Sequence, residues 1–198
     1  MPERLIVGIS GATGAIYGVR MLELLEPLED LETHLVISNA AGITIAYETD
    51  LSLADVEKLA DHAYRIGDIA ATLSSGSFKT AGMVVIPCSM KTLSGIANSY
   101  SDNLLTRAAD VVLKERRKLV LVVRETPFHL GHLRLMERVT EMGGVIAPPM
   151  PAFYHRPETL DDIVNQTVNR VCDLLGIELP KALFQRWGGL KESPEEDC

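Results

Sequence analysis

The sequence has few aromatic residues, few cysteines and no long hydrophobic run, and each shortage excludes a class of protein. Aromatics make up 5% of the 198 residues, so aliphatic side chains must fill the core. Cys88, Cys172 and Cys198 are too scattered for a disulfide framework and form no C-x-x-C pair. This favours a reducing, cytoplasmic setting. No run approaches the roughly 20 apolar residues that span a bilayer, and no secretion signal is expected near the N-terminus.

Positive charge is also in short supply. The chain has 19 basic and 27 acidic residues, a formal net charge of −8, which disfavours a broad nucleic-acid-binding surface. A small pocket that concentrates a few arginines on one phosphate remains compatible with this balance. Part of the acidity is local, because four carboxylates crowd the last seven residues. We therefore expect one domain over residues 1–188 and a solvated acidic tail over residues 189–198.

Short aliphatic runs alternate with longer amphipathic stretches along the chain. Unbroken aliphatic runs are typical of strands buried on both faces of a parallel sheet. The alternation predicts an α/β fold of Rossmann-like type, with a doubly wound, mainly parallel sheet in a single domain. The expected strands are 5–9, 34–37, 83–86, 119–123 and 145–147, and the expected helices are 15–28, 40–48, 54–62, 104–116, 130–142 and 159–175. Ser52 with Asp55, and Thr159 with Asp162, are expected to cap two of these helices.

A glycine-rich turn joins the first expected strand to the first helix. It reads Gly-Ile-Ser-Gly-Ala-Thr-Gly-Ala over residues 8–15. Free amides at a helix N-terminus favour a phosphate, and Ser10 and Thr13 could add hydroxyl donors. The spacing matches neither the dinucleotide nor the P-loop motif. We interpret the turn as a mononucleotide phosphate site, and a glycine-rich turn without a ligand is the alternative.

Two further strand ends carry hydroxyl groups. Residues 87–92 read Pro-Cys-Ser-Met-Lys-Thr after the third expected strand, and Ser38 follows the second. Open α/β sheets bind ligands at this carboxyl edge, so the hydroxyls should face one crevice. Cys88 could be a nucleophile at a helix N-terminus. Without a histidine nearby in the sequence, a buried structural cysteine is the preferred interpretation.

Several cationic side chains could hold a second anion. Arg107 and Lys114 are seven residues apart on one expected helix and therefore share a face, and Arg124 ends a strand at the ligand edge. Arg170 lies on the last helix, and Tyr154 lies in the proline-rich loop before it. Arginine, lysine and phenol groups suit a phosphate or diphosphate. Arg107 either faces such a ligand or pairs with a nearby carboxylate such as that of Asp110.

The histidines do not indicate a metal site. His129 and His132 are three residues apart and could share a helical face, but the sequence offers no third convergent ligand. His34, His62 and His155 show no further ligand spacing. We therefore predict no metal.

Seven segments together resemble the UbiX-type flavin prenyltransferases, formerly described as aromatic-acid or 3-polyprenyl-4-hydroxybenzoate decarboxylases. The similarity runs from about residue 4 to Trp187, and the segments occur in the family's order. One visible departure is Thr13, where the family often has serine. The segments are 7–15, 32–36, 86–93, 107–111, 113–116, 124–127 and 151–157.

The resemblance implies a Rossmann-like flavoprotein that forms a homododecamer with active sites where subunits meet. It implies metal-independent transfer of dimethylallyl from dimethylallyl monophosphate to N5 and C6 of reduced flavin mononucleotide (FMN). The prenylated FMN product would serve a partner UbiD-type decarboxylase, for example in ubiquinone biosynthesis. No nucleic acid and no membrane span are implied. The sequence does not distinguish a monophosphate from a diphosphate donor.

The resemblance also implies roles for individual residues. Glu48, Glu125 and Lys114 match catalytic positions, and either carboxylate could move the proton. Positions matching the prenyl-phosphate site are Arg107, Lys114, Tyr154 and Arg170. Those matching the flavin site are Gly11, Ala12, Thr13, Ser38, Ser89, Met90, Lys91, Thr92 and Arg124.

Three other functions fit parts of the same pattern. A flavin-dependent cysteine decarboxylase would be expected to carry a histidine in the first helix and a Pro-Ala-Met-Asn segment, whereas residues 148–151 read Pro-Pro-Met-Pro and the first helix has no histidine. A flavin carrier without turnover would use the flavin-binding motifs alone. A decarboxylase acting without a partner is the last alternative.

Overall fold

A single parallel sheet organises the computed structural model, which describes residues 2–189. Its six strands lie in the order β3-β2-β1-β4-β5-β6, and every neighbouring pair is parallel. The central strands are fully buried aliphatic runs, which explains why the sequence alternates so little between polar and apolar residues there. The strands are β1 Glu3–Ile9, β2 Leu31–Ile37, β3 His62–Tyr64, β4 Gly82–Cys88, β5 Lys118–Val123 and β6 Val145–Ile146.

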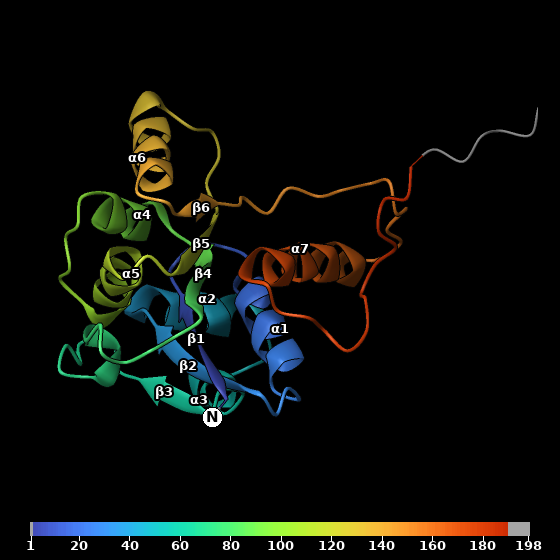
Figure 1. The fold of residues 1–198 in the computed structure, drawn as a ribbon. Helices are drawn as coiled ribbons and strands as arrows, with labels where there is room; N and C mark the ends of the chain where they lie inside the picture. The colour runs from blue at the N-terminus through green and yellow to red at the C-terminus, as the bar shows by residue number, and fades with distance from the viewer. Residues whose placement is uncertain (1, 190–198) are drawn as a thin grey trace, which may run out of the picture.

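Helices cover both faces of the sheet (Figure 1). One core cluster joins the sheet to α1 Ala15–Leu25, α2 Asn39–Glu48, α3 Leu53–Glu57 and α7 Leu160–Leu175. A second cluster, on the opposite face, joins the sheet to η1 Thr72–Ser74, α4 Met90–Ala97, α5 Leu104–Lys114 and α6 Leu130–Glu141. This arrangement confirms the predicted α/β, doubly wound class. None of the helices in the described chain is long and apolar enough to cross a membrane.

The predicted elements are mostly present, but several boundaries differ: α1 ends at Leu25 and β2 already begins at Leu31, and β3 and η1 were not predicted. The expected helix over 54–62 is wrong, because α3 ends at Glu57 and β3 begins at His62. Asp61 accepts hydrogen bonds from the Thr33 amide and hydroxyl at 2.7 and 2.9 Å, which fixes this segment beside β2. Helix α4 was not predicted. The capping boxes at Ser52 and Thr159 are confirmed.

The strand order places a switch point between β1 and β4. The chain leaves β1 toward β2 on one side and returns to β4 on the other, so the connections after these two strands diverge. Ser10 holds the two strand ends together: its hydroxyl donates to the Pro87 carbonyl at 3.1 Å and accepts from the Ser89 amide at 2.7 Å. A crevice is therefore expected between the loops that follow β1 and β4.

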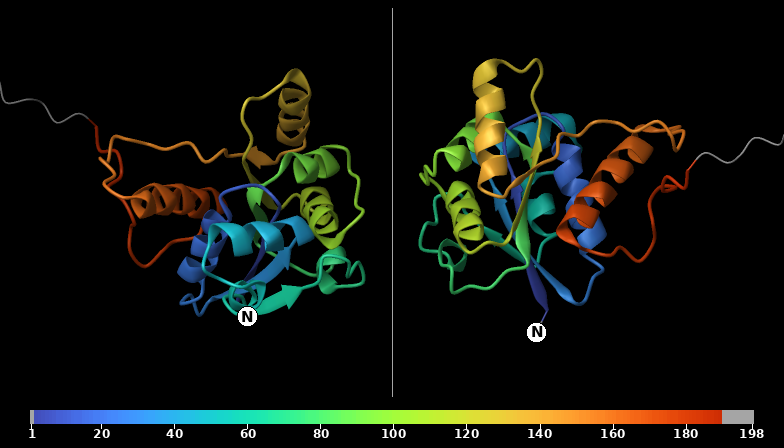
Figure 2. Two further views of the ribbon diagram at one scale, coloured as in Figure 1. Left: turned by 180° about the vertical axis from the view of Figure 1, so that it is seen from behind. Right: turned by 45° about the horizontal axis from the view of Figure 1, so that its top comes forward.

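An arm extends from the body beyond β6. The segment between β6 and α7 runs outward to the start of α7, and the chain after α7 runs outward again beside it (Figures 1 and 2). We call residues 147–160 and 177–189 the arm. Its exposed side chains include large apolar ones: Met150, Phe153, Tyr154, Leu160 and Trp187.

The C-terminal tail prediction concerns residues 189–198. Except for Gly189, these lie outside the described residues.

Candidate functional site

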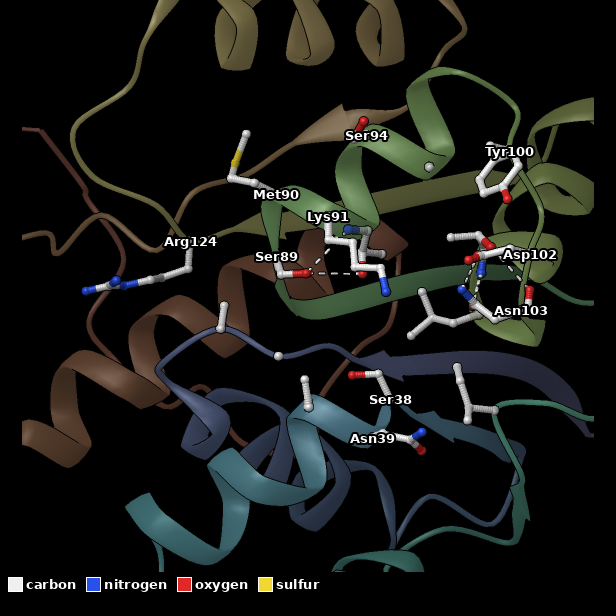
Figure 3. A pocket seen from close by; sticks show the side chains of 18 of the residues that line it. Ser38, Asn39, Ser89, Met90, Lys91, Ser94, Tyr100, Asp102, Asn103 and Arg124 are labelled. Atoms are coloured by element: carbon white, nitrogen blue, oxygen red, sulfur yellow. Dashed lines mark hydrogen bonds between the residues drawn. The ribbon is translucent and has the colours of Figure 1, made fainter.

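A cavity of about 1040 Å³ lies at the carboxyl edge of the sheet (Figure 3). The loops after β1, β2, β4 and β5 line it, together with the segment after β3 and the start of α5. Its position matches the switch point between β1 and β4. Its walls combine glycine and alanine backbone with hydroxyl, amide and charged side chains, which suits a flat polar ligand that bears an anion.

The β1–α1 turn forms one wall of the cavity. Two of its positions need glycine, one for its backbone conformation and one for close packing. Gly14 is the N-cap of α1 and has a φ of 93°, a left-handed conformation that glycine adopts without strain. Gly11 packs against α2, and a Cβ atom placed on it would lie 2.4 Å from the Cβ of Ala40. These glycines bring backbone against the cavity and against α2 at the same time.

A carboxylate already occupies the amides at the start of α1. Glu48 Oε2, at the end of α2, accepts hydrogen bonds from the Gly14 and Ala15 amides at 2.8 and 3.0 Å. Partial burial raises the pKa of Glu48, but hydrogen bonds from Thr13, Ala15 and Gly14 and the charge of Arg124 together hold it below its ordinary value. Glu48 is thus ionised at neutral pH. The expectation that these α1 amides are free for phosphate is not met.

Two other helix N-termini face the cavity. Ser38 caps α2 by accepting from the Ala41 amide at 3.2 Å, and Ser89 caps α4 by accepting from the Thr92 amide at 3.3 Å. Both serines line the cavity. Helix N-termini carry partial positive charge, so α2 and α4 favour an anion between them.

Charged side chains complete the cavity walls. Arg124 lies at one end and Asp102 and Asn103 at the other, and Lys91 reaches between Ser89 and Ser38 (Figure 3). Glu125 also lines the cavity, where its Oε1 accepts from the Thr126 amide at 2.9 Å. Cationic and anionic side chains therefore both line the cavity.

The structure brings together all the residues expected at a flavin. Each of the nine predicted flavin-binding residues lines the cavity, as does the predicted catalytic Glu125. Glu48 borders the same turn through Gly14 and Ala15 but is not part of the lining. The nine are Gly11, Ala12, Thr13, Ser38, Ser89, Met90, Lys91, Thr92 and Arg124.

Within one chain, the residues predicted to bind the prenyl phosphate do not lie at the cavity. Arg107 donates to the Ser74 carbonyl and pairs with Asp110 at 2.9 Å, the carboxylate alternative that its sequence context left open. Lys114 contacts Glu115, beside the Gly76 loop. Arg170 pairs with Asp173 at 2.7 Å.

Tyr154 lies in the arm, with its ring centroid 5.8 Å from that of Trp187. The four side chains lie outside the cavity, in two separate places: Arg107 and Lys114 along α5, and Tyr154 and Arg170 at the arm and α7.

Sequence reasoning missed much of the far wall of the cavity. Ser94, Gly95 and Asn98 come from the unpredicted helix α4 and the turn after it, and Ile66 and Gly67 follow the unpredicted strand β3. Asn39 was detectable, because it directly follows Ser38 at a strand end. The other missed residues are Ala40, Tyr100, Asp102, Asn103, Leu105 and Thr106.

Two other candidates have structural roles. Cys88 is completely buried, and this burial raises the pKa of its thiol far above the ordinary value, which confirms the structural interpretation. His129 caps α6, its Nδ1 accepting from the Gly131 amide at 3.0 Å, and its ring lies against His132.

Comparison with known proteins gives consistent matches. The sequence profile of the Flavoprotein family matches residues 1–172. The flavin prenyltransferase UbiX of Escherichia coli (strain K12) is 66% identical over 187 residues, which cover 94% of this chain and 99% of that protein. AnUbiX (PadA1), solved in complex with FMN and dimethylallyl pyrophosphate, superposes with a TM-score of 0.93 and 48% identity, covering 96% of this chain and 100% of that one. A dodecameric FMN-dependent UbiX-like decarboxylase from Escherichia coli O157:H7 gives a TM-score of 0.91 and 56% identity, covering 94% of this chain and 100% of that one.

Proposed function

The chain belongs to the UbiX-type flavin prenyltransferases, and we propose that it transfers dimethylallyl from dimethylallyl monophosphate to N5 and C6 of reduced FMN. The single observation that carries the proposal is the convergence of nine family-matched residues on one cavity. The product is prenylated FMN, which serves a UbiD-type decarboxylase.

The cavity fits FMN together with a small second substrate. Typical ligand sites have volumes of about 300–1,000 Å³, and this one is about 1040 Å³. The N-termini of α2 and α4, together with the charge of Arg124, can bind the phosphate of FMN. Backbone at Gly11 and Ala12 allows a planar ring to approach closely.

Reduced flavin supplies the two nucleophilic positions, N5 and C6, at which the prenyl carbons attach. The chain's residues orient the ring and move protons. Glu125 lines the cavity and can accept a proton at its free carboxylate oxygen. Glu48 is ionised and held at the Gly14 and Ala15 amides, so it acts as a fixed negative charge beside the β1–α1 turn. We assign the direct proton transfer to Glu125 because it lines the cavity.

The departing phosphate needs further cations, because Lys91 and Arg124 are the only basic side chains that the described chain places in the cavity lining. We propose that neighbouring subunits supply them, in a homododecamer like that described for the Escherichia coli O157:H7 relative. The apolar arm residues that project from the body support this arrangement, because contact with another subunit would bury them. Arg107, Lys114, Arg170 and the Tyr154 phenol then stabilise the leaving anion without a metal.

The direct experiment supplies both substrates without oxygen. Purified protein is incubated anaerobically with reduced FMN and dimethylallyl monophosphate, and in parallel with the diphosphate. We expect a flavin heavier by one C₅H₈ unit in mass spectrometry, with release of one phosphate, from the monophosphate. An unchanged flavin mass, with carbon dioxide released from an added carboxylic acid, would refute prenyl transfer.

The buried cysteines of the chain bear on the compartment. Cys88 and Cys172 are buried free thiols, and burial raises the pKa of Cys172 to about 12. Unoxidised thiols suit a cytoplasmic enzyme.

A UbiD-type decarboxylase that lacks prenylated FMN should become active when mixed with the reaction products, and it should stay inactive when the transferase is omitted.

A further inference from the structure

A polar cluster lies on one face of the sheet at its β3 edge, away from the flavin cavity. Arg4 on β1 pairs in register with Glu32 on β2, and His34 on β2 pairs in register with His62 on β3. Because side chains two residues apart on a strand share a face, Glu32 and His34 point to the same side. His34 lies four residues before the cavity residue Ser38, a separation of about 13 Å along a strand.

We propose that Glu32, His34 and His62 form a Zn²⁺ site. One ligand atom from each residue lies within 4.8 Å of the others. Glu32 Oε1 is 2.6 Å from His62 Nε2 and 3.6 Å from His34 Nε2. Tetrahedral zinc, bound at about 2.0–2.2 Å, separates its ligands by about 3.3 Å, and the two observed distances bracket this value.

His34 provides the strongest evidence for a ligand. It is only 2% exposed, and its Nε2 has no hydrogen-bond partner in the described structure. A buried nitrogen without a partner is costly unless something binds it. Its Nδ1 lies 3.0 Å from the Tyr64 hydroxyl, and a proton donated there leaves the Nε2 lone pair free, 3.6 Å from Glu32 Oε1. Metal-binding histidines are oriented in this way by their second nitrogen.

The remaining groups suit zinc with one open position. Arg4 Nε holds Glu32 Oε2 at 3.0 Å, which leaves Oε1 for the ion and fixes the carboxylate. The His62 side chain is half exposed, so water can complete the coordination. Two imidazoles with one carboxylate favour zinc over magnesium or calcium.

A metal at this position would cross-link the edge of the sheet. Strand β3 has three residues, and Ile66 and Gly67 of the flavin cavity follow it after one intervening residue. Zinc joining β2 to β3 would hold that cavity wall. The role is structural and separate from the transfer reaction.

Calorimetry on full-length, chelator-treated protein tests the site with ZnSO₄ as the titrant. We expect one tight site in the wild type and a loss of at least about 100-fold in affinity in His62→Ala, which is a surface change. Tyr64→Phe should weaken binding by about 10-fold, as outer-shell changes do. The matched control is His132→Ala, which removes a histidine of the other close pair and should bind zinc like the wild type.

Three results would overturn the site: no zinc uptake by the wild type, equal zinc affinity in the wild type and His62→Ala, or loss of zinc binding in His132→Ala instead. A thermal melt separates metal binding from folding. Zinc should raise the melting temperature of the wild type but not of His62→Ala, whereas the two metal-free proteins should melt alike. Neither readout depends on prenyl transfer.

Discussion

At the scale of single residues, the cavity depends on a close approach that only glycine permits. In Gly11→Ala the new methyl would lie 2.4 Å from the Ala40 Cβ, so the β1–α1 turn or α2 must shift. We expect a loss of about 1–3 kcal/mol in unfolding free energy, as for overpacked sites, and weaker FMN binding. Urea denaturation and FMN fluorescence titration measure the two effects.

Gly42→Ala is the control for this substitution. It lies on the same helix α2, and its new Cβ would meet Leu53 only at 3.8 Å, an ordinary contact. Alanine is a better helix former than glycine by about 1 kcal/mol, so this variant should be more stable than the wild type and bind FMN normally. Similar behaviour of the two variants would show that the Ala40 contact does not define the cavity.

Glu48 makes a pH-dependent contribution at the same turn. Its pKa is lowered below the ordinary value of 4.5, so ionised Glu48 stabilises the fold above about pH 4.5, and this stability is lost as the pH falls through the lowered pKa. Glu48→Gln keeps the shape but removes the charge. We expect it to be about 0.5 kcal/mol less stable at pH 7, since Glu48 is solvent-exposed, and equal to the wild type in strong acid.

Urea melts at several pH values check this expectation, with the exposed Glu29→Gln as the matched variant. A difference between wild type and Glu48→Gln that grows toward acid pH would contradict the assigned role of the carboxylate.

The sequence predicted the cavity residues better than the contacts of the charged ones. Residues after strands, such as Ser38 and Ser89, are placed by the topology alone, so a correct sheet prediction brings them together. The resemblance to the UbiX-type family is confirmed by the comparisons. Where a long side chain such as Arg107 points depends on neighbours like Ser74 and Asp110, which only the folded chain reveals.

At the scale of elements, the capping box at Thr159 stabilises the N-terminus of α7, next to the arm. Thr159 accepts from the Asp162 amide at 3.1 Å, and Asp162 bonds back to the Thr159 amide at 2.9 Å. Thr159→Ala removes half of this box and should lower the unfolding free energy by about 1 kcal/mol. Thr140→Ala, inside α6, is the control and should change it by less than about 0.5 kcal/mol. Equal urea midpoints for the two variants would rule out the cap as a stabilising element.

Short elements account for the errors in the predicted fold. Strand β3 has three residues with no aliphatic run, and tertiary contacts such as Asp61 with Thr33 fix its position. Helix α4 has eight residues and follows directly on β4, so in the sequence its polar first turn resembles only the hydroxyl-rich end of a strand. Long periodic helices and buried strands were predicted correctly because each carries its own repeating apolar pattern.

At the scale of the whole molecule, the proposed transfer site is shared between chains. The described chain separates Arg124, in the cavity, from Arg170, on α7. If each site combines one chain's cavity with another chain's arm and α7, two inactive variants can restore each other. We therefore expect Arg124→Ala and Arg170→Ala, each inactive alone, to regain activity when co-expressed in mixed oligomers.

The expected recovery follows from random mixing. Half of the cavities retain Arg124, and half of the neighbouring α7 helices retain Arg170, so about a quarter of the sites should be intact. Mixing the Arg124→Ala variant with the double variant is the control and should restore nothing. Anaerobic assays by mass spectrometry measure the product. If Arg170 served the cavity of its own chain, every site in the mixture would lack one arginine, and absence of recovery in verified mixed oligomers would exclude the shared site.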